Sequence, residues 1–268
     1  MPEGPECRRY ALALGEHVGG ESLSSFEIKS GRYLKKDMPG IEDIKKELPL
    51  KIQGVGVHGK LIYLIFDNKS SLWSTLGMTG CWQRDESKHT RAVMTFESGK
   101  KAYFNDIRNF GTLKYCTDPK LLVSKLQSLG PDLLAEEVTS DKFISQLRKN
   151  NDWNITKALM DQSIVAGVGN YIKAEALWLA RISPHRKVSD ISDNNMQVLN
   201  KAIQTVMKES FVSGGATVKS YKDFFGELGN YSSRFMVYNQ KADPDGHEVV
   251  KEKTPDGRTT HWVPEVQR

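Results

Sequence analysis

The sequence predicts an α+β protein with a β-rich first half, a helical segment and a short return to strands. Short β-rich runs separated by glycines fill the region from residue 23 to residue 104. From residue 119 to residue 212 the apolar residues instead recur every three or four positions, as on one face of a helix. A chain of 268 residues is long enough for two domains, each with its own core.

The first half is expected to be a β-sandwich preceded by one helix. The helix spans residues 5–18, with Tyr10 and Leu14 on its apolar stripe, and the glycine pair 19–20 ends it. A Ser-Gly turn at 98–99 predicts a hairpin. The expected strands cover residues 23–28, 52–57, 61–66, 91–97 and 101–104. Short strands with one leading helix are typical of a sandwich domain.

The helical segment is expected to begin at Asp118-Pro119, where aspartate caps the helix and proline takes its first turn. The expected helices cover residues 119–128, 140–149, 154–162, 169–180 and 192–212. Gly214-Gly215 stops the last of them. After it, residues 232–263 are interpreted as two strands joined by turns, with Phe235–Tyr238 in the first strand.

Composition excludes some classes of protein. No stretch approaches the roughly 18 apolar residues of a membrane span, and the start MPEGPE does not resemble a secretion signal. The three cysteines, Cys7, Cys81 and Cys116, are widely spaced and argue against a disulfide framework. We expect a reducing intracellular compartment (cytoplasm, nucleoid or nucleus) and no membrane partner. The net charge of +5 is compatible with a polyanionic partner without demanding one.

Residues 165–185, VAGVGNYIKAEALWLARISPH, combine a glycine turn with an apolar-periodic helix. The N-terminus of such a helix offers unpaired N–H groups and the positive end of the helix dipole, which suit a phosphate. A tight corner that simply requires glycines explains the same residues. The local sequence does not decide between these two interpretations.

Six motifs in the same order carry a resemblance to a known family. They are PEGPE at the start, HGKLIY (58–63), TLGMTG (75–80), FNDIRNFG (104–111), the GVGN helix and GGATVKSY (214–221). Together they resemble the Fpg/Nei family, which contains formamidopyrimidine-DNA glycosylase, endonuclease VIII and the Nei-like proteins. The resemblance runs from residue 2 to about residue 263.

The resemblance implies four parts of the chain. Residues 1–118 would form an N-terminal β-sandwich catalytic domain, and residues 119–140 a linker with a connecting helix. Residues 141–230 would form a helix-two-turn-helix DNA-binding domain, and residues 231–268 a β-hairpin finger. A monomer is expected.

The resemblance also gives the MPEGPE start a chemical meaning. In the family the initiator Met is removed and the exposed proline, here Pro2, is the nucleophile. An α-amino group has a pKa of about 8, so an appreciable fraction is neutral at pH 7. Attack on C1′ of the damaged nucleotide displaces the base and leaves an iminium ion, which makes the 2′ proton acidic. The implied protein is a bifunctional DNA glycosylase and AP lyase of base excision repair, working by β/δ-elimination without a cofactor.

Glu3 and Lys60 complete the implied catalytic group. Glu3 would handle protons at the reacting centre. Lys60 would contact the phosphates of the lesion nucleotide and hold the amine neutral by its charge; a lysine that merely snorkels at a sheet edge is the alternative. Glu6 and Glu175 would support the site, Glu6 by positioning the N-terminal helix. An exposed glutamate at a helix start is the alternative for Glu6.

A damaged base must be flipped out of the duplex, and the gap must be filled. Met78, Arg108 and Phe110 match the void-filling trio of the family, because a thioether and a ring can wedge between bases while a guanidinium pairs with the widowed base. A core aromatic is the alternative for Phe110. The other expected DNA contacts are Gly169, Asn170 and Arg91, the last at a position where the family often has histidine.

The C-terminal finger departs from the bacterial members of the family, which carry a four-cysteine zinc finger. This chain has no cysteine after Cys116, so the ligands of a tetrahedral zinc site are absent. It resembles the zincless finger of some Nei-like proteins, and we expect no metal, since His247 and His261 lack sulfur partners. Arg258 falls at the finger arginine that reaches the lesion phosphates. A solvated turn arginine is the alternative.

Two features disagree about the substrate, which is expected to be double-stranded DNA with oxidised bases or abasic sites. Segment 219–235 resembles the loop with which bacterial Fpg covers 8-oxoguanine, whereas the zincless finger resembles the Nei-like branch. We expect thymine glycol-type, hydantoin or formamidopyrimidine lesions ahead of 8-oxoguanine, with an Fpg-like preference for 8-oxoguanine as the alternative.

Two other classes of protein are alternatives to an active glycosylase. A catalytically inactive damaged-DNA-binding module would be expected to lack Pro2, Glu3 or Lys60. An RNA-associated protein would not need the N-terminal Pro-Glu pair or the trio.

Overall fold

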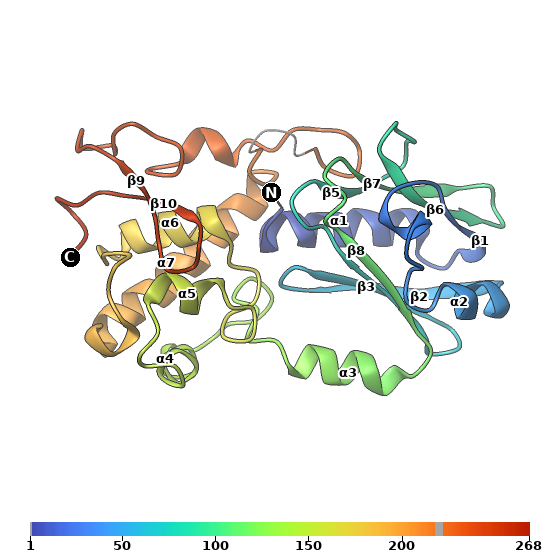
Figure 1. The fold of residues 1–268 in the computed structure, drawn as a ribbon, viewed down its shortest axis with the longest axis horizontal. Helices are drawn as coiled ribbons and strands as arrows, with labels where there is room; N and C mark the ends of the chain where they lie inside the picture. The colour runs from blue at the N-terminus through green and yellow to red at the C-terminus, as the bar shows by residue number, and fades with distance from the viewer. Residues whose placement is uncertain (1, 218–221) are drawn as a thin grey trace. The chain divides into compact units, whose positions relative to one another are not determined.

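The computed structural model describes residues 2–217 and 222–268, which divide into two compact units. The first unit consists of Met1–Pro2, Glu6–Gln127 and Gly214–Gly229. The second unit consists of Glu3–Pro5, Ser128–Ser213 and Asn230–Arg268. Figure 1 shows the strands and helices of both units, coloured along the chain. Met1, whose removal the sequence predicts, lies outside the described residues.

The first unit contains the leading helix and most of the strands. Its helices are α1 (Gly4–Val18), which starts in the short N-terminal segment of the second unit, α2 (Ile41–Glu47), α3 (Pro119–Gln127) and the short 3-10 helix η1 (Arg32–Leu34). Its strands are β1 (Ser22–Ile28), β2 (Leu50–His58), β3 (Leu61–Phe66), β4 (Ser71–Thr75), β5 (Gly80–Gln83), β6 (Thr90–Phe96), β7 (Lys101–Asp106) and β8 (Thr112–Cys116). The predicted start of α3 is confirmed, because the Asp118 carboxylate accepts the N–H of Lys120 at 2.9 Å.

These strands form one antiparallel sheet in the order β5-β7-β6-β1-β2-β3-β4-β8. β1 and β2 pair only through Ser22 with Lys51 and Leu23 with Leu50, so this junction divides the sheet into the two layers of a sandwich. β6 and β7 form the predicted hairpin, and Gly99 in its turn has a φ of 85°, which favours glycine. The β-sandwich predicted from the sequence is confirmed.

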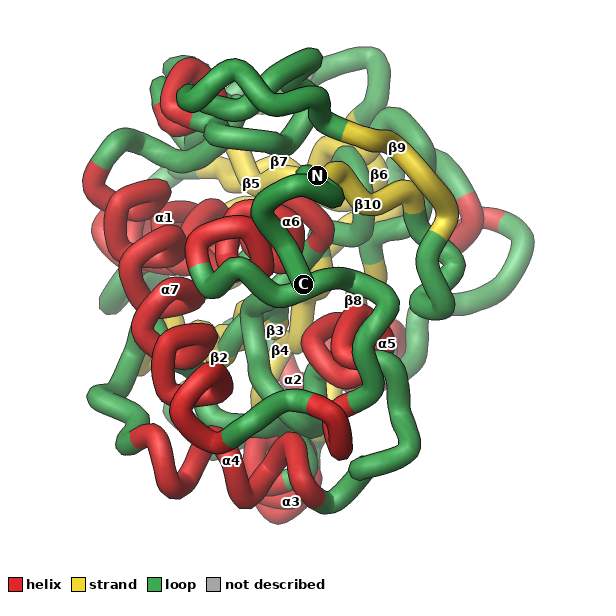
Figure 2. The backbone as a smooth tube through the Cα atoms, turned by 90° about the vertical axis from the view of Figure 1, so that its left-hand side faces the viewer, coloured by secondary structure: helices red, strands yellow, loops and turns green. Residues whose placement is uncertain are grey.

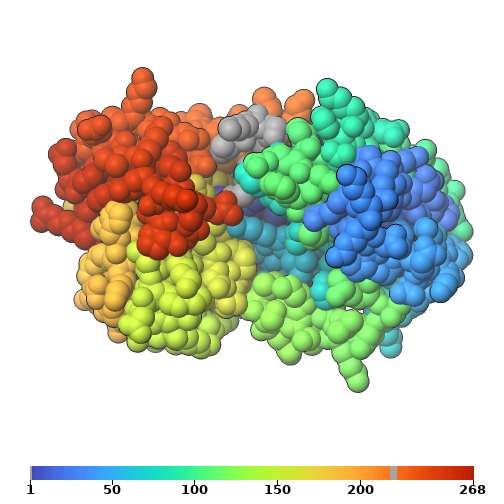
Figure 3. Space-filling model, in the orientation of Figure 1, coloured from blue at the N-terminus to red at the C-terminus, as the bar shows by residue number. Residues whose placement is uncertain are grey.

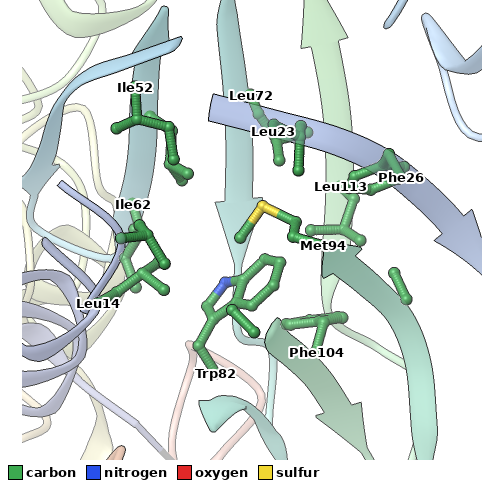
Figure 4. Close-up of a cluster of buried hydrophobic side chains, with 14 of the residues drawn as sticks. Leu14, Leu23, Phe26, Ile52, Ile62, Leu72, Trp82, Met94, Phe104 and Leu113 are labelled. Atoms are coloured by element: carbon green, nitrogen blue, oxygen red, sulfur yellow. The ribbon is translucent and has the colours of Figure 1, made fainter. Parts of the chain in front are cut away.

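The core of the first unit lies between the layers and includes the apolar stripe of α1. Tyr10 and Leu14 are at most 1% exposed, as the helical spacing predicts. Trp82 packs against Phe104 with ring centroids 5.2 Å apart, and its Nε1 donates to the Ser74 hydroxyl at 3.0 Å. The buried indole therefore keeps its hydrogen bond. Figure 4 shows Leu14, Trp82 and Phe104 within this cluster.

The second unit is mainly helical. Its elements are α4 (Ser140–Arg148), α5 (Ile155–Met160), α6 (Asn170–Leu179), η2 (Val188–Asp190), α7 (Asp193–Val212), η3 (Tyr231–Arg234), β9 (Val250–Lys253) and β10 (Thr259–Trp262). Figure 2 shows α4, α5, α6 and α7 in red. α6 contacts α5, α7 and β10, and it is buried from Tyr171 to Leu177, so it is the central helix of the unit. Among the described residues, no helix has the length and apolar character needed to cross a bilayer.

The strand predicted at Phe235–Tyr238 is wrong. The backbone N–H groups of residues 236–238 donate to the carboxylate of Glu175 on α6, at distances of 2.7 to 3.0 Å, instead of to a neighbouring strand. A buried backbone needs partners for its N–H groups, but a carboxylate provides them as well as a strand does. The two-stranded hairpin forms later, from β9 and β10 around the turn at 255–257.

A small separate core holds this hairpin region on α6. Its buried members are Ala174, Val237, Val249 and Val263. Figure 3 shows the C-terminal residues, in red, against residues coloured yellow. The partly buried hydrophobic residues that pack against this core are Trp178, Met236, Tyr238 and Val266.

A buried histidine on β10 lies beside this small core. His261 is 5% exposed, its ring lies edge-on to that of Tyr238 with centroids 4.8 Å apart, and its Nδ1 has no hydrogen-bond partner among the described residues. Burial, together with the charges of Lys251 and Lys173, lowers the pKa of His261 to about 4. His261 is therefore neutral at neutral pH.

We predict that His261 lowers the stability of the protein as the pH falls from 6.5 to about 4. In this window the unfolded chain binds a proton at this histidine that the folded chain does not, so the free energy of unfolding decreases with falling pH. Above pH 6.5 the contribution is fully present. Urea unfolding between pH 4 and pH 7 should show a smaller decrease for His261→Gln than for the wild type. Equal pH dependence in both proteins would contradict this prediction.

Candidate active site

A buried carboxylate occupies the N-terminus of α6. Glu3 is 1% exposed, and its two carboxylate oxygens accept the N–H groups of Tyr171 at 3.0 Å and Ile172 at 3.3 Å. First-turn N–H groups have no intrahelical partner and lie at the positive end of the helix dipole, so they stabilise an anion. The next residue is also fixed, because the Gly4 N–H donates to the Gly167 carbonyl at 2.9 Å. The start of the chain is thereby bound to α6.

Gly169 makes this contact sterically feasible. A Cβ at this position would lie 2.2 Å from the carboxyl carbon of Glu3, far inside van der Waals contact. The φ of Gly169 is −130°, so the requirement comes from space and not from an unusual backbone conformation. The GVGN turn is thus a tight corner against the chain's own Glu3. Glu3 already occupies the N–H groups of Tyr171 and Ile172, which the alternative interpretation offered to a phosphate.

Asn170 and the finger hairpin are connected directly. The Asn170 Nδ2 donates to the carbonyl of Thr259 at 2.9 Å, and Thr259 follows Arg258 in the chain. Arg258 itself is exposed at the turn between β9 and β10. The structure therefore brings two residues that were predicted from separate motifs into one region, next to the N-terminus of α6.

Glu175 is buried on α6, where it holds the segment before the finger. Burial raises the pKa of the Glu175 carboxyl, and the three backbone N–H groups that it accepts oppose that rise. The sequence of α6, NYIKAEALWL, contains Glu175 and a second buried charged residue, Lys173, in an otherwise mostly apolar helix. A charge inside an apolar stripe is a signal that could have singled out Lys173, which the sequence reasoning missed.

The other predicted catalytic and supporting residues lie in the first unit. Pro2 is buried immediately before α1. Lys60 is in the turn that joins β2 and β3, after Gly59, whose φ of 56° permits that tight turn. Glu6 is fully buried, and its Oε1 accepts the Ala216 N–H at 2.8 Å. The exposed-glutamate alternative for Glu6 is therefore wrong, since Glu6 anchors the segment after α7.

Met78, Arg108 and Phe110 form one cluster on the first unit. Arg108 Nη1 lies 3.0 Å from the sulfur of Met78, and the guanidinium carbon lies 4.8 Å from the centroid of the Phe110 ring. Phe110 is 52% exposed, so its interpretation as a core aromatic is wrong. A half-exposed ring held against a cation is an arrangement suited to contact with a flat apolar partner.

A buried aspartate that the sequence reasoning missed fixes both loops of this cluster. Asp106 is 1% exposed; its Oδ2 accepts the Gly111 N–H at 2.7 Å, and its Oδ1 accepts the Thr79 hydroxyl at 2.5 Å. The Thr79 hydroxyl oxygen in turn accepts the N–H of Arg108 at 2.8 Å. Thr79 follows Met78 in the chain. One carboxylate thus positions the two loops that carry the trio.

Arg91 is held by the protein itself. Its guanidinium donates to the carbonyls of Asp106 at 2.7 Å and Ile107 at 3.3 Å, and to the Ser30 hydroxyl at 2.8 Å. These contacts brace the end of β7 just before Arg108. A phosphate contact by Arg91 stays a prediction.

The predicted lesion-covering segment 219–235 is only partly described. Residues 218–221, which end the GGATVKSY motif, lie outside the described residues. Beyond them the Tyr10 hydroxyl donates to the Lys222 carbonyl, Arg9 pairs with Asp223 at 3.5 Å, and Phe224 is buried in the core of the first unit. Residues 222–224 are thus packed on the first unit. Tyr231 and Phe235, at the end of the segment, belong to the second unit and pack against the ring of Tyr171.

Among the described residues, one group of side chains has metal-ligand character. Ligand atoms of Asp243, Asp245 and His247 lie within 4.8 Å of one another. However, the Asp243 carboxylate already accepts the N–H groups of Asp245 at 3.0 Å and His247 at 2.9 Å, as well as the His247 ring at 3.1 Å. These hydrogen bonds account for the loop without an ion, and we assign no metal site to it.

Three family models match consecutive parts of the chain. The N-terminal domain of formamidopyrimidine-DNA glycosylase matches residues 1–113, its H2TH domain residues 129–222, and its C-terminal domain residues 227–268. The formamidopyrimidine-DNA glycosylases of Cytobacillus firmus and Streptococcus pneumoniae are 30% and 32% identical, and each match covers 100% of this chain and at least 99% of the relative. The chain thus combines a β-sandwich, a helical H2TH domain and a terminal hairpin, which places it in the class of DNA glycosylases with an H2TH domain.

Solved structures agree with this assignment. A MutM structure in complex with carbocyclic 8-oxo-G containing DNA matches with a TM-score of 0.87 and 28% identity, over 100% of both chains. A complex of a Lactococcus lactis Fpg mutant with Fapy-dG containing DNA gives the same values. The chain belongs to the formamidopyrimidine-DNA glycosylase family and is a DNA glycosylase of base excision repair.

We predict that Asp106→Asn destabilises the loops of the trio. An asparagine can keep one acceptor oxygen, but its amide would face a donor, and leaving a buried donor unpaired costs about 1–3 kcal/mol. Urea unfolding should show a loss of this size. Thr79→Val should have a smaller effect and Thr79→Ser almost none, because serine retains the hydroxyl. An Asp106→Asn protein as stable as the wild type would show that the carboxylate does not hold the loops.

Proposed function

We propose that this glycosylase is also an AP lyase, and that Pro2 is its nucleophile once Met1 is removed. The observation that supports this best is the buried Glu3 carboxylate, which two N–H groups of α6 hold in place. Pro2 directly precedes Glu3 in the chain, so its amine belongs to the residue next to a fixed carboxylate. A carboxylate near the reacting amine can take up and return protons and can stabilise a developing cation.

The proposed reaction proceeds through one covalent intermediate. The neutral Pro2 nitrogen attacks C1′, the bond from C1′ to the base breaks, and the base leaves with a proton from an acid in the site. Opening of the sugar ring gives an iminium ion. This electron sink permits loss of the 2′ proton and expulsion of the 3′ phosphate, and a second elimination expels the 5′ phosphate. Lys60, a cation in the β2–β3 turn, would bind the lesion phosphate and favour the neutral amine.

The exposed trio would interact with the duplex once the damaged nucleotide has been flipped out. Met78 and Phe110 would fill the gap in the base stack, and Arg108 would pair with the widowed base. The contact of Arg108 with both partners supports a single, preorganised wedge. Asn170 and Arg258, at α6 and the hairpin turn, would bind phosphates next to the lesion, with Gly169 and Arg91 as further contacts and Glu6 and Glu175 as supports.

We further propose residues 1–118 as the catalytic domain and 141–230 as the DNA-binding domain, joined by a linker at 119–140 and followed by a finger at 231–268. A monomer without metal or other cofactor is proposed, in a reducing intracellular compartment. The reducing compartment is supported by Cys7, Cys81 and Cys116, none of which takes part in a disulfide.

For the substrate we propose oxidised bases in duplex DNA, with thymine glycol-type, hydantoin or formamidopyrimidine lesions excised ahead of 8-oxoguanine. The names of the relatives support ring-opened purines, and one related structure contains an 8-oxo-G analogue. A panel of duplexes, each with one formamidopyrimidine, hydantoin, thymine glycol or 8-oxoguanine, tests the order of preference. Fastest excision of 8-oxoguanine would overturn the proposed order and support the Fpg-like alternative.

We predict that Pro2→Gly largely abolishes excision and borohydride trapping while duplex affinity stays near that of the wild type. Glycine supplies a primary amine without the proline ring, so weak residual turnover is expected. Pro5→Ala, which alters the other proline of MPEGPE, is the matched control and should retain activity. Full activity of a protein that retains Met1 would refute the mechanism, because a blocked nitrogen cannot form an iminium. No trapped adduct with the wild type on any lesion would instead favour an inactive damage-binding module.

Arg258→Ala should lose about 1.5–3 kcal/mol of transition-state binding, or roughly ten- to hundredfold in kcat/KM, since a charge-assisted phosphate contact is removed. The slope of log binding constant against log salt should decrease by about one unit. The melting temperature should hardly change, because Arg258 is exposed.

Lys253→Ala removes an equal charge from the same hairpin and is the control for a general electrostatic effect. If both variants behave alike, or if Arg258→Ala has wild-type kinetics, Arg258 is only a solvated residue of the turn.

A further inference from the structure

The finger hairpin contains a buried ion pair with α6. The Lys173 ammonium lies 2.5 Å from an oxygen of Asp256, and the two side chains are 0% and 2% exposed. Asp256 belongs to the turn between β9 and β10, two residues before Arg258. Burying two charges is costly unless the pair is well satisfied, so this arrangement requires a physical explanation.

Lys173 and Asp256 shift the pKa of one another, and Asp256 has a further hydrogen bond. Burial lowers the pKa of Lys173, and the hydrogen bond and charge of Asp256 oppose that effect. For Asp256, burial alone would raise the pKa, but hydrogen bonds from Lys173 and Thr254 outweigh it, so that the pKa is lowered. The second oxygen of Asp256 accepts the Thr254 hydroxyl at 2.6 Å.

The same aspartate organises the turn that presents Arg258. The N–H of Arg258 points to the Asp256 carboxylate at 3.4 Å, and the Thr254 N–H donates to the Arg258 carbonyl at 3.0 Å. The Thr254 hydroxyl also lies 2.6 Å from that of Thr260. The turn is thus closed around Asp256. A second hydrogen bond joins this turn to α6, from the Asn170 side chain to the Thr259 carbonyl.

The finger, residues 231–268, has no cysteine that could hold it through a metal, since the last cysteine of the chain is Cys116. Among the described residues, the apolar cluster beneath the hairpin has four buried members, and four partly buried hydrophobic residues pack against it. We propose that the Lys173–Asp256 ion pair is the anchor that fixes the hairpin turn on α6 and so positions Arg258, which gives a metal-free finger a defined geometry. This rests on the phosphate-binding role proposed above for Arg258.

Lys173 is a positioning residue, because its ammonium is fully buried and does not reach solvent. The proposal predicts that Lys173 acts through Arg258, and a double-mutant cycle measures this directly. Lys173→Met should lower kcat/KM about tenfold or more in the wild-type background. In the Arg258→Ala background the same substitution should cause almost no further loss.

Amide hydrogen exchange gives a readout that is independent of activity. Lys173→Met should reduce protection in the turn 254–260 while the amides of α6 and α7 remain protected. Because Lys173→Met leaves a buried carboxylate unpaired, the variant can fold poorly. The double variant Lys173→Met/Asp256→Asn removes both charges and should recover stability, but it should not recover kcat/KM.

Glu252→Gln on β9 is the matched control. It alters the contact between the Glu252 carboxylate on the hairpin and the His185 ring, which are 2.6 Å apart and away from the turn. Kinetics close to the wild type are expected for it.

Three outcomes overturn the anchor. The first is that the losses of kcat/KM from Lys173→Met and Arg258→Ala add up in the double-mutant cycle. The second is that amide hydrogen exchange in the turn 254–260 is unchanged by Lys173→Met. The third is that Lys173→Met/Asp256→Asn has full kcat/KM, which would make the ion pair purely structural. Arg258→Ala with wild-type kinetics would instead refute the proposed role of Arg258, and the exchange experiment would then decide the anchor alone.

Discussion

The contact between the Glu3 carboxylate and the first turn of α6 is the constraint on which the candidate site depends. It joins the third residue of the chain to a helix that begins at residue 170, and it is buried. Three features meet there: a carboxylate, two backbone N–H groups of the first helical turn and a glycine at position 169. A chain terminus would otherwise fray. Here the buried Glu3 contact holds the N-terminal segment on α6.

Buried carboxylates accept hydrogen bonds from irregular segments in both units of this protein. Asp106 fixes two loops of the first unit, and Glu175 satisfies the backbone before the finger. Each carboxylate accepts several donors, which offsets the cost of its burial. Loops that must present side chains to a large ligand cannot bury their own apolar residues. A carboxylate beneath the loop fixes the backbone and leaves the outer face available.

The regular elements were predictable because their signals are local. The stripe of α1, the start of α3 at Asp118 and the hairpin of β6 and β7 all follow from spacing and turn residues within a few positions. The error at Phe235–Tyr238 has a different origin. A short apolar run predicts a strand only if its backbone partners are strands, and here the partner is Glu175, about 60 residues earlier in the chain. No local pattern contains that information.

The sequence by itself determined the order of elements, the absence of thiolates from the finger and, through its motifs, the family and the candidate nucleophile Pro2. The tertiary structure decided which residues of those motifs contact one another. It showed that the glycine turn receives Glu3, that Phe110 is exposed against Arg108, and that a buried lysine meets an aspartate of the hairpin turn. The physical reason is that helices and turns arise from neighbouring residues, whereas buried charges are stable only with partners that the folded chain brings from distant positions.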